Sequence, residues 1–351
     1  MQSVKCLNHY IYFNEEGYEF LNNFLSDNNF SSLFILVDSN TATYCLPTFL
    51  ELLATNISLE IIEIEAGEEN KTLEICTHIW QSLNELGADR KSLIINLGGG
   101  VICDIGGFIA STYKRGIAFI NIPTTLLAMV DAALGGKNGV NLGNLKNQIG
   151  TITEPKSVLI DTNYLNTLSK EQMLSGLAEM LKHGLIYDTE YWNNFKNLNS
   201  LKTDDLLNLI KRSVEIKSEI VSQDLTETGN RKSLNFGHTL GHAIETFFLN
   251  KNTPILHGKA VAIGIILEAH LSYQKKYITH KMFIEIKALI DDLFEKYTFS
   301  ETDITEIISY TTYDKKNEYG KTLFVLLKGI GNFVIDQEVT HQEIYLAFSE
   351  Y

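Results

Sequence analysis

The stretch Leu93-Ile94-Ile95-Asn96-Leu97-Gly98-Gly99-Gly100 decides the fold that this chain of 351 residues is expected to adopt. A short, mainly apolar run of this kind is typical of a buried strand, and residues 101–113 after it are compatible with a helix. Glycines at such a junction let the backbone approach a pyrophosphate, for which the helix N-terminus supplies N–H groups. The spacing differs from the G-x-G-x-x-G signature, so a tight turn is the competing interpretation.

The neighbouring segments repeat this alternation of strand and helix. Residues 33–37 and 59–64 suit buried strands, and residues 72–86, followed by a glycine, have helical periodicity. A further strand is expected over residues 117–122, before threonines that can cap a helix. Alternating strands and helices with glycine at strand ends imply a parallel, doubly wound sheet. We therefore predict an α/β protein whose residues 1–161 form a Rossmann-like, parallel-sheet, nucleotide-binding domain.

The chain changes character after about residue 161. Long amphipathic segments dominate the second half, and short β-like runs return only near its end. The expected helices span 169–186, 204–223, 237–249 and 257–276, and the β-like runs span 323–327 and 333–335. The sequence thus predicts a second, mainly α-helical domain over residues 162–351.

The composition is that of an ordinary globular protein, with 44% hydrophobic and 21% charged residues. A formal net charge of -14 argues against nucleic acid as a partner, because counterion release needs clustered Lys and Arg. The cysteines (Cys6, Cys45, Cys76, Cys103) show no C-x-x-C spacing, which favours a reducing compartment. The sequence shows neither a secretory signal nor an apolar stretch of membrane length, so a cytoplasmic protein without a membrane partner is expected.

Three histidines in the second half suggest a metal site. His238 and His242 are four residues apart in a helix-periodic run and share one helix face, and His257 begins the next helical segment. A histidine that only packs or hydrogen-bonds is the competing interpretation for each. The zincin signature lacks its glutamate here, since Thr239 follows the first histidine. Glu179, acidic among small and apolar neighbours, is the best carboxylate ligand, and a Glu/His/His set leaves positions open for substrate oxygens.

Further charged side chains accompany these ligands. Lys182 and His183 share a helix with Glu179, and His183 is an additional candidate ligand. Lys217 and Arg231 add positive charge near the histidines, although solvated cations are the competing interpretation. The second half is therefore expected to bind a metal ion together with an anionic, hydroxylated substrate.

The first half offers its own anion-binding candidates. Residues 135–147, rich in Gly and Asn, are expected to form a loop that carries lysines and an amide to one phosphate or carboxylate, with surface lysines as the alternative. The candidates there and nearby are Lys137, Lys146, Asn147, Arg115 and Asp131, and those for a dinucleotide are Asp38, Asn40, Glu68 and Lys71. A divalent ion, several cations and a nearby dinucleotide favour hydride transfer at a metal-bound alcohol.

Together these motifs resemble the 3-dehydroquinate synthase family, of the sugar phosphate cyclase group, in the family's order over most of the chain. The similarity runs through Gly98 to Asp104, Tyr113 to Gly116, Pro123 to Leu127, Val130-Asp131, Gly135 to Lys137, Lys146-Asn147, Ala178-Glu179 with Lys182, Asn235 to His238, His257-Gly258 and Asp314-Lys315-Lys316. The chain departs from the family's pattern at Cys103, Asn138 and Ser169, and none of these departures removes a charged or ligating group.

The resemblance implies one zinc or cobalt ion held by Glu179, His238 and His257. It assigns His242 to substrate contact instead of metal binding. Substrate contacts are implied for Arg115, lent across a homodimer, and for Asp131, Lys137, Asn147, Lys182, Lys217, Arg231, Asn235 and one lysine of the Lys315–Lys316 pair. NAD contacts are implied for Asp38, Asn40, Glu68, Lys71, Gly99, Gly100, Asp104, Thr124, Thr125, Lys137, Lys146 and Thr167.

The implied activity is that of a carbon–oxygen lyase of the shikimate pathway, which converts 3-deoxy-D-arabino-heptulosonate 7-phosphate to 3-dehydroquinate and phosphate. NAD would oxidise an alcohol transiently, phosphate would be eliminated, and the ketone would be reduced again before ring opening and aldol closure. The alternatives are another sugar phosphate cyclase, of the inosose or valiolone synthase type, and a metal-dependent glycerol or alcohol dehydrogenase. Lys217 and Arg231 favour the first activity, because a substrate carboxylate needs cationic partners.

Overall fold

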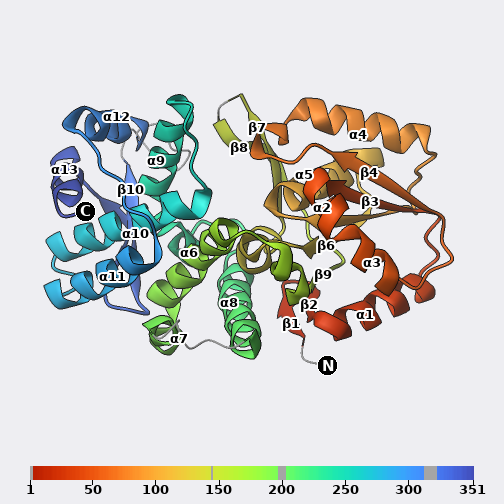
Figure 1. The fold of residues 1–351 in the computed structure, drawn as a ribbon, viewed down its shortest axis with the longest axis horizontal. Coiled ribbons are helices and arrows are strands. Elements are labelled where there is room, and N and C mark those ends of the chain that lie inside the picture. Colours follow the sequence, from red (N-terminus) through yellow and green to blue (C-terminus); the bar gives the residue numbers. More distant parts are fainter. Residues whose placement is uncertain (1–2, 144, 197–202, 312–321) are drawn as a thin grey trace. The chain divides into compact units, whose positions relative to one another are not determined.

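A computed structural model describes residues 3–143, 145–196, 203–311 and 322–351 of the chain (Figure 1). The chain divides into two compact units, Met1–Ser169 and Lys170–Tyr351. The first is an α/β unit and the second is mainly helical, so the predicted fold class is confirmed. Lys315 and Lys316, expected near substrate, lie outside the described residues.

The first unit is built on a seven-stranded sheet with the strand order β1-β2-β9-β6-β5-β3-β4. All neighbouring strands in it are parallel except β1 and β2, which are antiparallel. The strands are β1 (Val4–Cys6), β2 (His9–Phe13), β3 (Leu33–Asp38), β4 (Leu59–Ile64), β5 (Leu93–Gly98), β6 (Ala118–Pro123) and β9 (Ser157–Ile160), and a separate hairpin contains β7 (Lys137–Leu142) and β8 (Leu145–Ile152). The helices are α1 (Asn14–Asp27), α2 (Ser39–Tyr44), α3 (Leu46–Leu52), α4 (Leu73–Glu85) and α5 (Gly100–Thr112), with single turns at η1 (Glu68–Asn70), η2 (Tyr113–Arg115), η3 (Ala128–Ala132) and η4 (Thr162–Thr167).

Helices cover both faces of this sheet, which is why its central strands β3, β5 and β6 are mainly apolar and almost wholly buried. Figure 1 shows α4 and α5 on one side and α1 and α3 on the other. Phe34 of β3 and Ile94 of β5 belong to one buried cluster with α4 and α5. On the other side Tyr18 of α1 and Phe49 of α3 are in ring contact. The doubly wound sheet predicted from strand–helix alternation is therefore observed.

The prediction of a loop over residues 135–147 is wrong in part, because most of these residues belong to the antiparallel hairpin β7–β8. Gly139 and Gly150 face each other in its register, and a side chain on either glycine would run into the opposite strand. Asn and Gly are depleted in strands, so the pattern gave no strand signal. A second unexpected feature is η3, a π-helical turn that carries Asp131.

The second unit packs helices around a two-stranded antiparallel sheet. The helices are α6 (Lys170–Tyr187), α7 (Thr189–Asn194), α8 (Thr203–Gln223), α9 (His238–Asn250), α10 (His257–Gln274), α11 (His280–Leu293), α12 (Glu301–Thr311) and α13 (His341–Ser349), with a turn η6 (Asn230–Asn235), and the strands are β10 (Leu323–Leu327) and β11 (Phe333–Glu338). Apolar residues of α9, α10, α12, β10 and α13 form one buried cluster, with Leu240, Leu267 and Phe324 fully buried in it.

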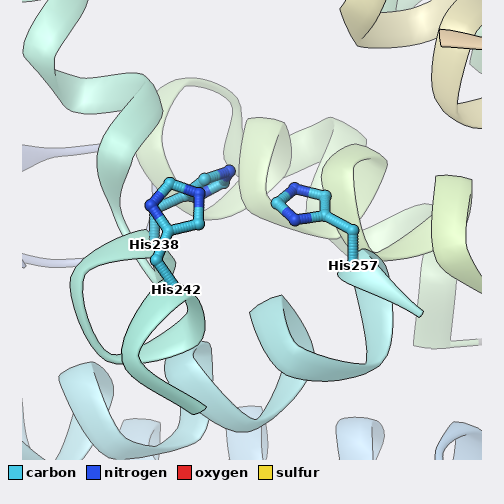
Figure 2. Close-up of side chains that lie close together, drawn as sticks. All are labelled: His238, His242 and His257. Carbon is cyan, nitrogen blue, oxygen red and sulfur yellow. The ribbon is translucent and has the colours of Figure 1, made fainter. Parts of the chain in front are cut away.

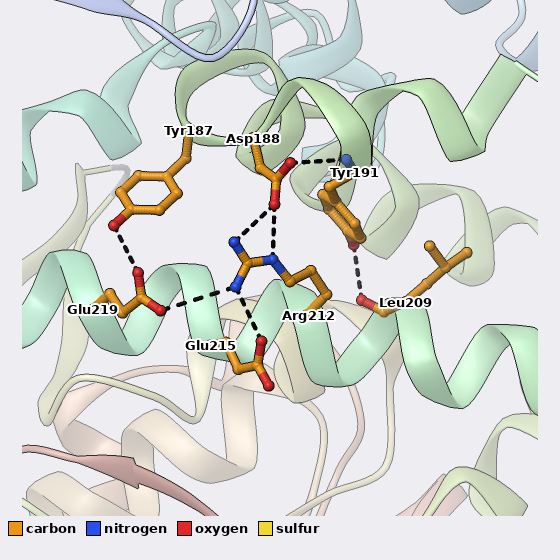
Figure 3. Close-up of polar contacts among 7 residues, drawn as sticks. All are labelled: Tyr187, Asp188, Tyr191, Leu209, Arg212, Glu215 and Glu219. Carbon is orange, nitrogen blue, oxygen red and sulfur yellow. Dashed lines mark hydrogen bonds and ion pairs between the residues drawn. The ribbon is translucent and has the colours of Figure 1, made fainter.

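A polar network joins α7 to α8 (Figure 3). The Arg212 guanidinium on α8 donates from Nε (2.8 Å) and Nη2 (2.7 Å) to one oxygen of Asp188, the residue that caps α7. A third donor of Arg212 reaches Glu215, and the hydroxyl of Tyr187 donates to Glu219 at 2.6 Å. These contacts hold α8 against the end of α6, and α8 carries Lys217.

Candidate active site

Three helices of the second unit bring the predicted metal ligands together. Glu179 comes from the middle of α6, His238 is the first residue of α9, and His257 is the first residue of α10. Figure 2 shows His238, His242 and His257 extending from α9 and α10 toward one another. A ring nitrogen from each of these three histidines lies within 4.8 Å of the others.

The spacing of the Glu179 carboxylate from two imidazoles fits a shared metal ion. Oε1 of Glu179 lies 3.3 Å from Nε2 of His238 and 3.5 Å from Nε2 of His257. Two ligands of a tetrahedral ion with bonds of about 2.0–2.1 Å are separated by about 3.3 Å. Both Glu179 oxygens are buried, and Oε1, which faces the two imidazoles, receives no hydrogen bond of ordinary geometry within the described structure. The donor set and its separations therefore suit a zinc or cobalt ion.

Lys182 completes the charge balance around this carboxylate. Its ammonium is paired with Oε2 of Glu179, and the two residues are 1% and 0% exposed. Burial acts to raise the pKa of Glu179, but Lys182 and His238 lower it well below its usual range. Burial, followed by Lys182, lowers the pKa of His238. The carboxylate is thus ionised and His238 neutral, as metal ligation requires.

His257 has a second carboxylate on its other nitrogen. Nδ1 of His257 lies 3.4 Å from Oε2 of Glu245, a buried residue of α9 that the sequence reasoning missed. Burial lowers the pKa of His257, yet Glu245 and Glu179 outweigh it and raise the pKa to about 10. A carboxylate on the far nitrogen of a ligating imidazole fixes its tautomer and orientation.

The other two histidines are placed differently. The His242 ring lies 5.2 Å from that of His238 and 5.8 Å from that of His257, measured between centroids. His183 has Nδ1 at 2.7 Å from the Ser213 hydroxyl, and a ring nitrogen of His183 lies within 4.8 Å of a Glu179 oxygen.

Two further cations predicted for the second unit, within its described residues, are buried. Lys217 on α8 is 6% exposed, and Arg231 in η6 is 2% exposed. Arg231 donates from Nη1 to the carbonyl of Leu225 at 2.7 Å, and Asn235 donates to Glu227 at 2.6 Å. Burial of both cations contradicts the interpretation of Lys217 and Arg231 as solvated side chains.

In the first unit, Gly98, Gly99 and Gly100 lie at the junction between β5 and α5. Gly99 is the cap residue of this helix and provides no side-chain cap, and the carbonyl of Gly98 accepts from Thr124 at 3.0 Å. Backbone N–H groups at the start of a 13-residue helix are able to bind an anion. This is the arrangement expected for a pyrophosphate.

A polar network links several residues predicted to contact NAD. Nζ of Lys71, which is buried, donates to Asp104 at 2.5 Å and to Oδ1 of Asn147 at 2.6 Å. Asn141 was not predicted, yet its amide donates to Glu68 (3.0 Å), its Oδ1 accepts from the Asn147 backbone (2.9 Å), and its own backbone donates to Lys71 (2.8 Å). Residues from η1, α5 and the β7–β8 hairpin are thus held together.

The other predicted residues of this unit are spread over several elements. Asp38 caps α2 through Thr41, Asn40 is exposed on α2, and the hydroxyl of Thr167 donates to the carbonyl of Tyr164. Thr125 lies against Gly99, and Gly100 against Ala132. Arg115 and Lys137 are exposed, Asp131 and Lys146 are half-buried, and Arg115 has φ of 71°.

The first unit therefore has a nucleotide-binding type of sheet, and the second has a Glu/His/His cluster on three helices whose spacing suits a metal ion. A family model for the 3-dehydroquinate synthase N-terminal domain matches residues 61–175, and one for the C-terminal domain matches residues 176–317. The chain belongs to the 3-dehydroquinate synthase family.

Curated relatives agree over nearly the whole chain. The 3-dehydroquinate synthase of Parabacteroides distasonis is 43% identical over 326 residues, which cover 92% of this chain and 92% of that protein. The 3-dehydroquinate synthase of Corynebacterium diphtheriae is 36% identical over 321 residues, covering 88% and 89%.

Solved structures of related cyclases have the same fold. A 2-deoxy-scyllo-inosose synthase complexed with carbaglucose-6-phosphate, NAD+ and Co2+ matches with a TM-score of 0.86 and 25% identity, covering 99% of each chain. The 2-epi-5-epi-valiolone synthase of Streptomyces hygroscopicus, with NAD+ and Zn2+ bound, matches with a TM-score of 0.83 and 26% identity, covering 100% of this chain and 98% of that one. An iron containing alcohol dehydrogenase, at 18% identity and a TM-score of 0.63, shares the fold alone. Within the described ranges, no helix has the length and apolarity needed to span a bilayer.

Proposed function

We propose that the chain converts 3-deoxy-D-arabino-heptulosonate 7-phosphate to 3-dehydroquinate and phosphate, with NAD and one Zn2+ or Co2+ ion as cofactors. The observation that carries this proposal is the fully buried Glu179 carboxylate between two imidazoles and the Lys182 ammonium, in a chain of this family. When bound, NAD supplies a hydride acceptor that is regenerated in each cycle, and the ion supplies a Lewis acid.

The residues of the second unit divide into ligands and substrate contacts. Glu179, His238 and His257 hold the ion, and the other coordination positions are left to oxygens of the substrate. The buried ammonium of Lys182 stabilises negative charge that develops on those oxygens. His242, whose ring is close to both ligand imidazoles, holds or accepts a proton at the substrate hydroxyls.

The choice of substrate depends on the remaining cations. Lys217, Arg231 and the adjacent Asn235 are proposed to bind the substrate carboxylate, because a desolvated anion needs paired donors. In the first unit the α5 N-terminus is proposed to bind the NAD pyrophosphate, and Lys71 with its network to orient the nucleotide. The full NAD set proposed is Asp38, Asn40, Glu68, Lys71, Gly99, Gly100, Asp104, Thr124, Thr125, Lys137, Lys146 and Thr167, and Asp131, Lys137, Asn147 and Arg115 are proposed as substrate contacts, with Arg115 acting across a homodimer.

A comparison of substrates tests this proposal. Purified protein with NAD and Co2+ is mixed either with the heptulosonate 7-phosphate or with glucose 6-phosphate, which has no carboxylate, and phosphate release is followed. We expect phosphate only from the heptulosonate. Equal release from glucose 6-phosphate would favour a cyclase whose sugar phosphate substrate has no carboxylate and would contradict the assignment of Lys217 and Arg231.

A further inference from the structure

The two helices that begin with ligand histidines have no cap of their own. The cap residue of α9 is Gly237 and that of α10 is Leu256, and neither provides a side-chain hydrogen bond. By contrast α4, α11 and α13 are each capped by the threonine that precedes them. The first N–H groups of a helix need partners, so those of α9 and α10 must be satisfied from elsewhere.

Glu268 of α10 caps α9 from across the helix interface. Its carboxylate is 0% exposed and accepts from the backbone of Gly237 at 2.6 Å and of Leu240 at 3.1 Å. Gly237 has φ of 78°, and a side chain there would collide with Ile265 of α10. A buried carboxylate bonded to two N–H groups at a helix N-terminus is a strong, charge-assisted contact. It fixes the backbone on both sides of His238.

Ser175 of α6 caps the N-terminus of α10 from the neighbouring helix. Its hydroxyl, 1% exposed, accepts from the backbone N–H of Gly258 at 3.0 Å. A side chain on Gly258 would overlap the backbone of Ser175, so the two helices touch at this point. Gly258 directly follows His257, and Ser175 lies one helical turn before Glu179 on α6. The hydrogen bond between Gly258 and Ser175 therefore links the backbone beside His257 to the helix that carries Glu179.

We propose that Glu268 and Ser175 are positioning residues of the metal site, which set the relative places of Glu179, His238 and His257 without touching the ion. The caps join α6 to α10 and α10 to α9, so all three ligand helices are linked next to a ligand histidine. Ligand separations of 3.3 and 3.5 Å leave little room for a helix to shift. Outer-shell partners of metal ligands are typically worth about 10–100-fold in affinity. This inference rests on the proposed metal site.

The test is a titration of metal-free full-length protein with Co2+ alone, read by the visible absorption of the bound ion and by competition with a chelator. The variants are Glu268→Gln, which turns one N–H acceptor into a donor, and Ser175→Ala, which deletes one oxygen and no charge. Thr340→Ala is the matched control, because it removes the local cap of α13, which carries none of the proposed ligands. Circular dichroism establishes that each variant is folded.

We expect both variants to bind Co2+ about 10–100-fold more weakly than the parent, with an altered absorption spectrum. Thr340→Ala should lower the melting temperature yet bind Co2+ like the parent. If the folded variants bind Co2+ within about twofold of the parent's affinity, Glu268 and Ser175 do not position the ligands. If neither variant folds, the two residues act in stability only, and the positioning role is overturned as well. A parent protein that binds no Co2+ would instead contradict the metal site itself.

Discussion

Replacing Glu179 by Gln in the metal-free protein breaks the buried ion pair with Lys182 at the centre of the site. Lys182 is 1% exposed, so its ammonium would stay in the interior without its carboxylate. Breaking a buried pair in this way costs about 3–5 kcal/mol of unfolding free energy. With a urea m-value of about 2 kcal/mol/M for a unit of this size, the unfolding midpoint should fall by roughly 2 M.

The assay follows urea unfolding with a chelator present, through the fluorescence of Trp192, which is fully buried in the second unit. A Trp80→Phe background removes the tryptophan of the first unit, so the signal reports one unit alone. The double variant Glu179→Gln/Lys182→Met removes both charges and should recover at least half of the lost stability, because no buried charge is then left unpaired. A midpoint shift below about 0.5 M, or a double variant less stable than the single one, would refute this reasoning.

Three further outcomes follow from the site. Burial lowers the pKa of His257, but Glu245 and Glu179 outweigh it and raise the pKa to about 10. His257 must therefore lose a proton to bind metal. About one proton should therefore be released per Co2+ bound, with affinity rising roughly tenfold per pH unit from about pH 7 to 9, and a pH-independent Kd for Co2+ would contradict this. His242→Ala should keep the Co2+ affinity of the parent while kcat falls about 10²–10⁴-fold, whereas loss of the metal would make His242 a ligand. Asn141→Ala removes the side chain that hydrogen-bonds both Glu68 and the Asn147 backbone, and it should raise the Kd for NAD, measured by calorimetry, about tenfold. The control is Gln148→Ala, at an exposed position of the same hairpin. Equal Kd values for the two variants would show that Asn141 plays no part in binding NAD.

Much of the fold could be predicted from the sequence because its signals are local. The central strands β3 and β5 are mainly apolar runs, and Thr72, the first residue of the helix predicted over residues 72–86, is the cap residue of α4. Among the proposed ligands, Glu179 could be singled out because an acidic residue in an apolar helix is costly to bury without a partner. The structure places it between the predicted histidines.

The features that were missed depend on contacts between distant segments. The β7–β8 hairpin is rich in glycine and asparagine, whose strand propensity is low, and the π-helical turn at Asp131 has no sequence pattern. Glu268 lies in an apolar run of α10, so the burial cost that identified Glu179 applies to it as well. Its partners, the backbone N–H groups of Gly237 and Leu240, could be identified only from the packed helices.

The ratio of phosphate released to NADH formed tests the proposed function most directly. Purified protein is given the heptulosonate 7-phosphate, Co2+ and NAD at a concentration far below that of the substrate. Because the cofactor is regenerated in each cycle, many phosphates should be released per NAD without net NADH, and a chelator should stop the release until Co2+ or Zn2+ is restored. Steady NADH accumulation with a simple alcohol, and no phosphate from the heptulosonate, would contradict the cyclase and identify a dehydrogenase.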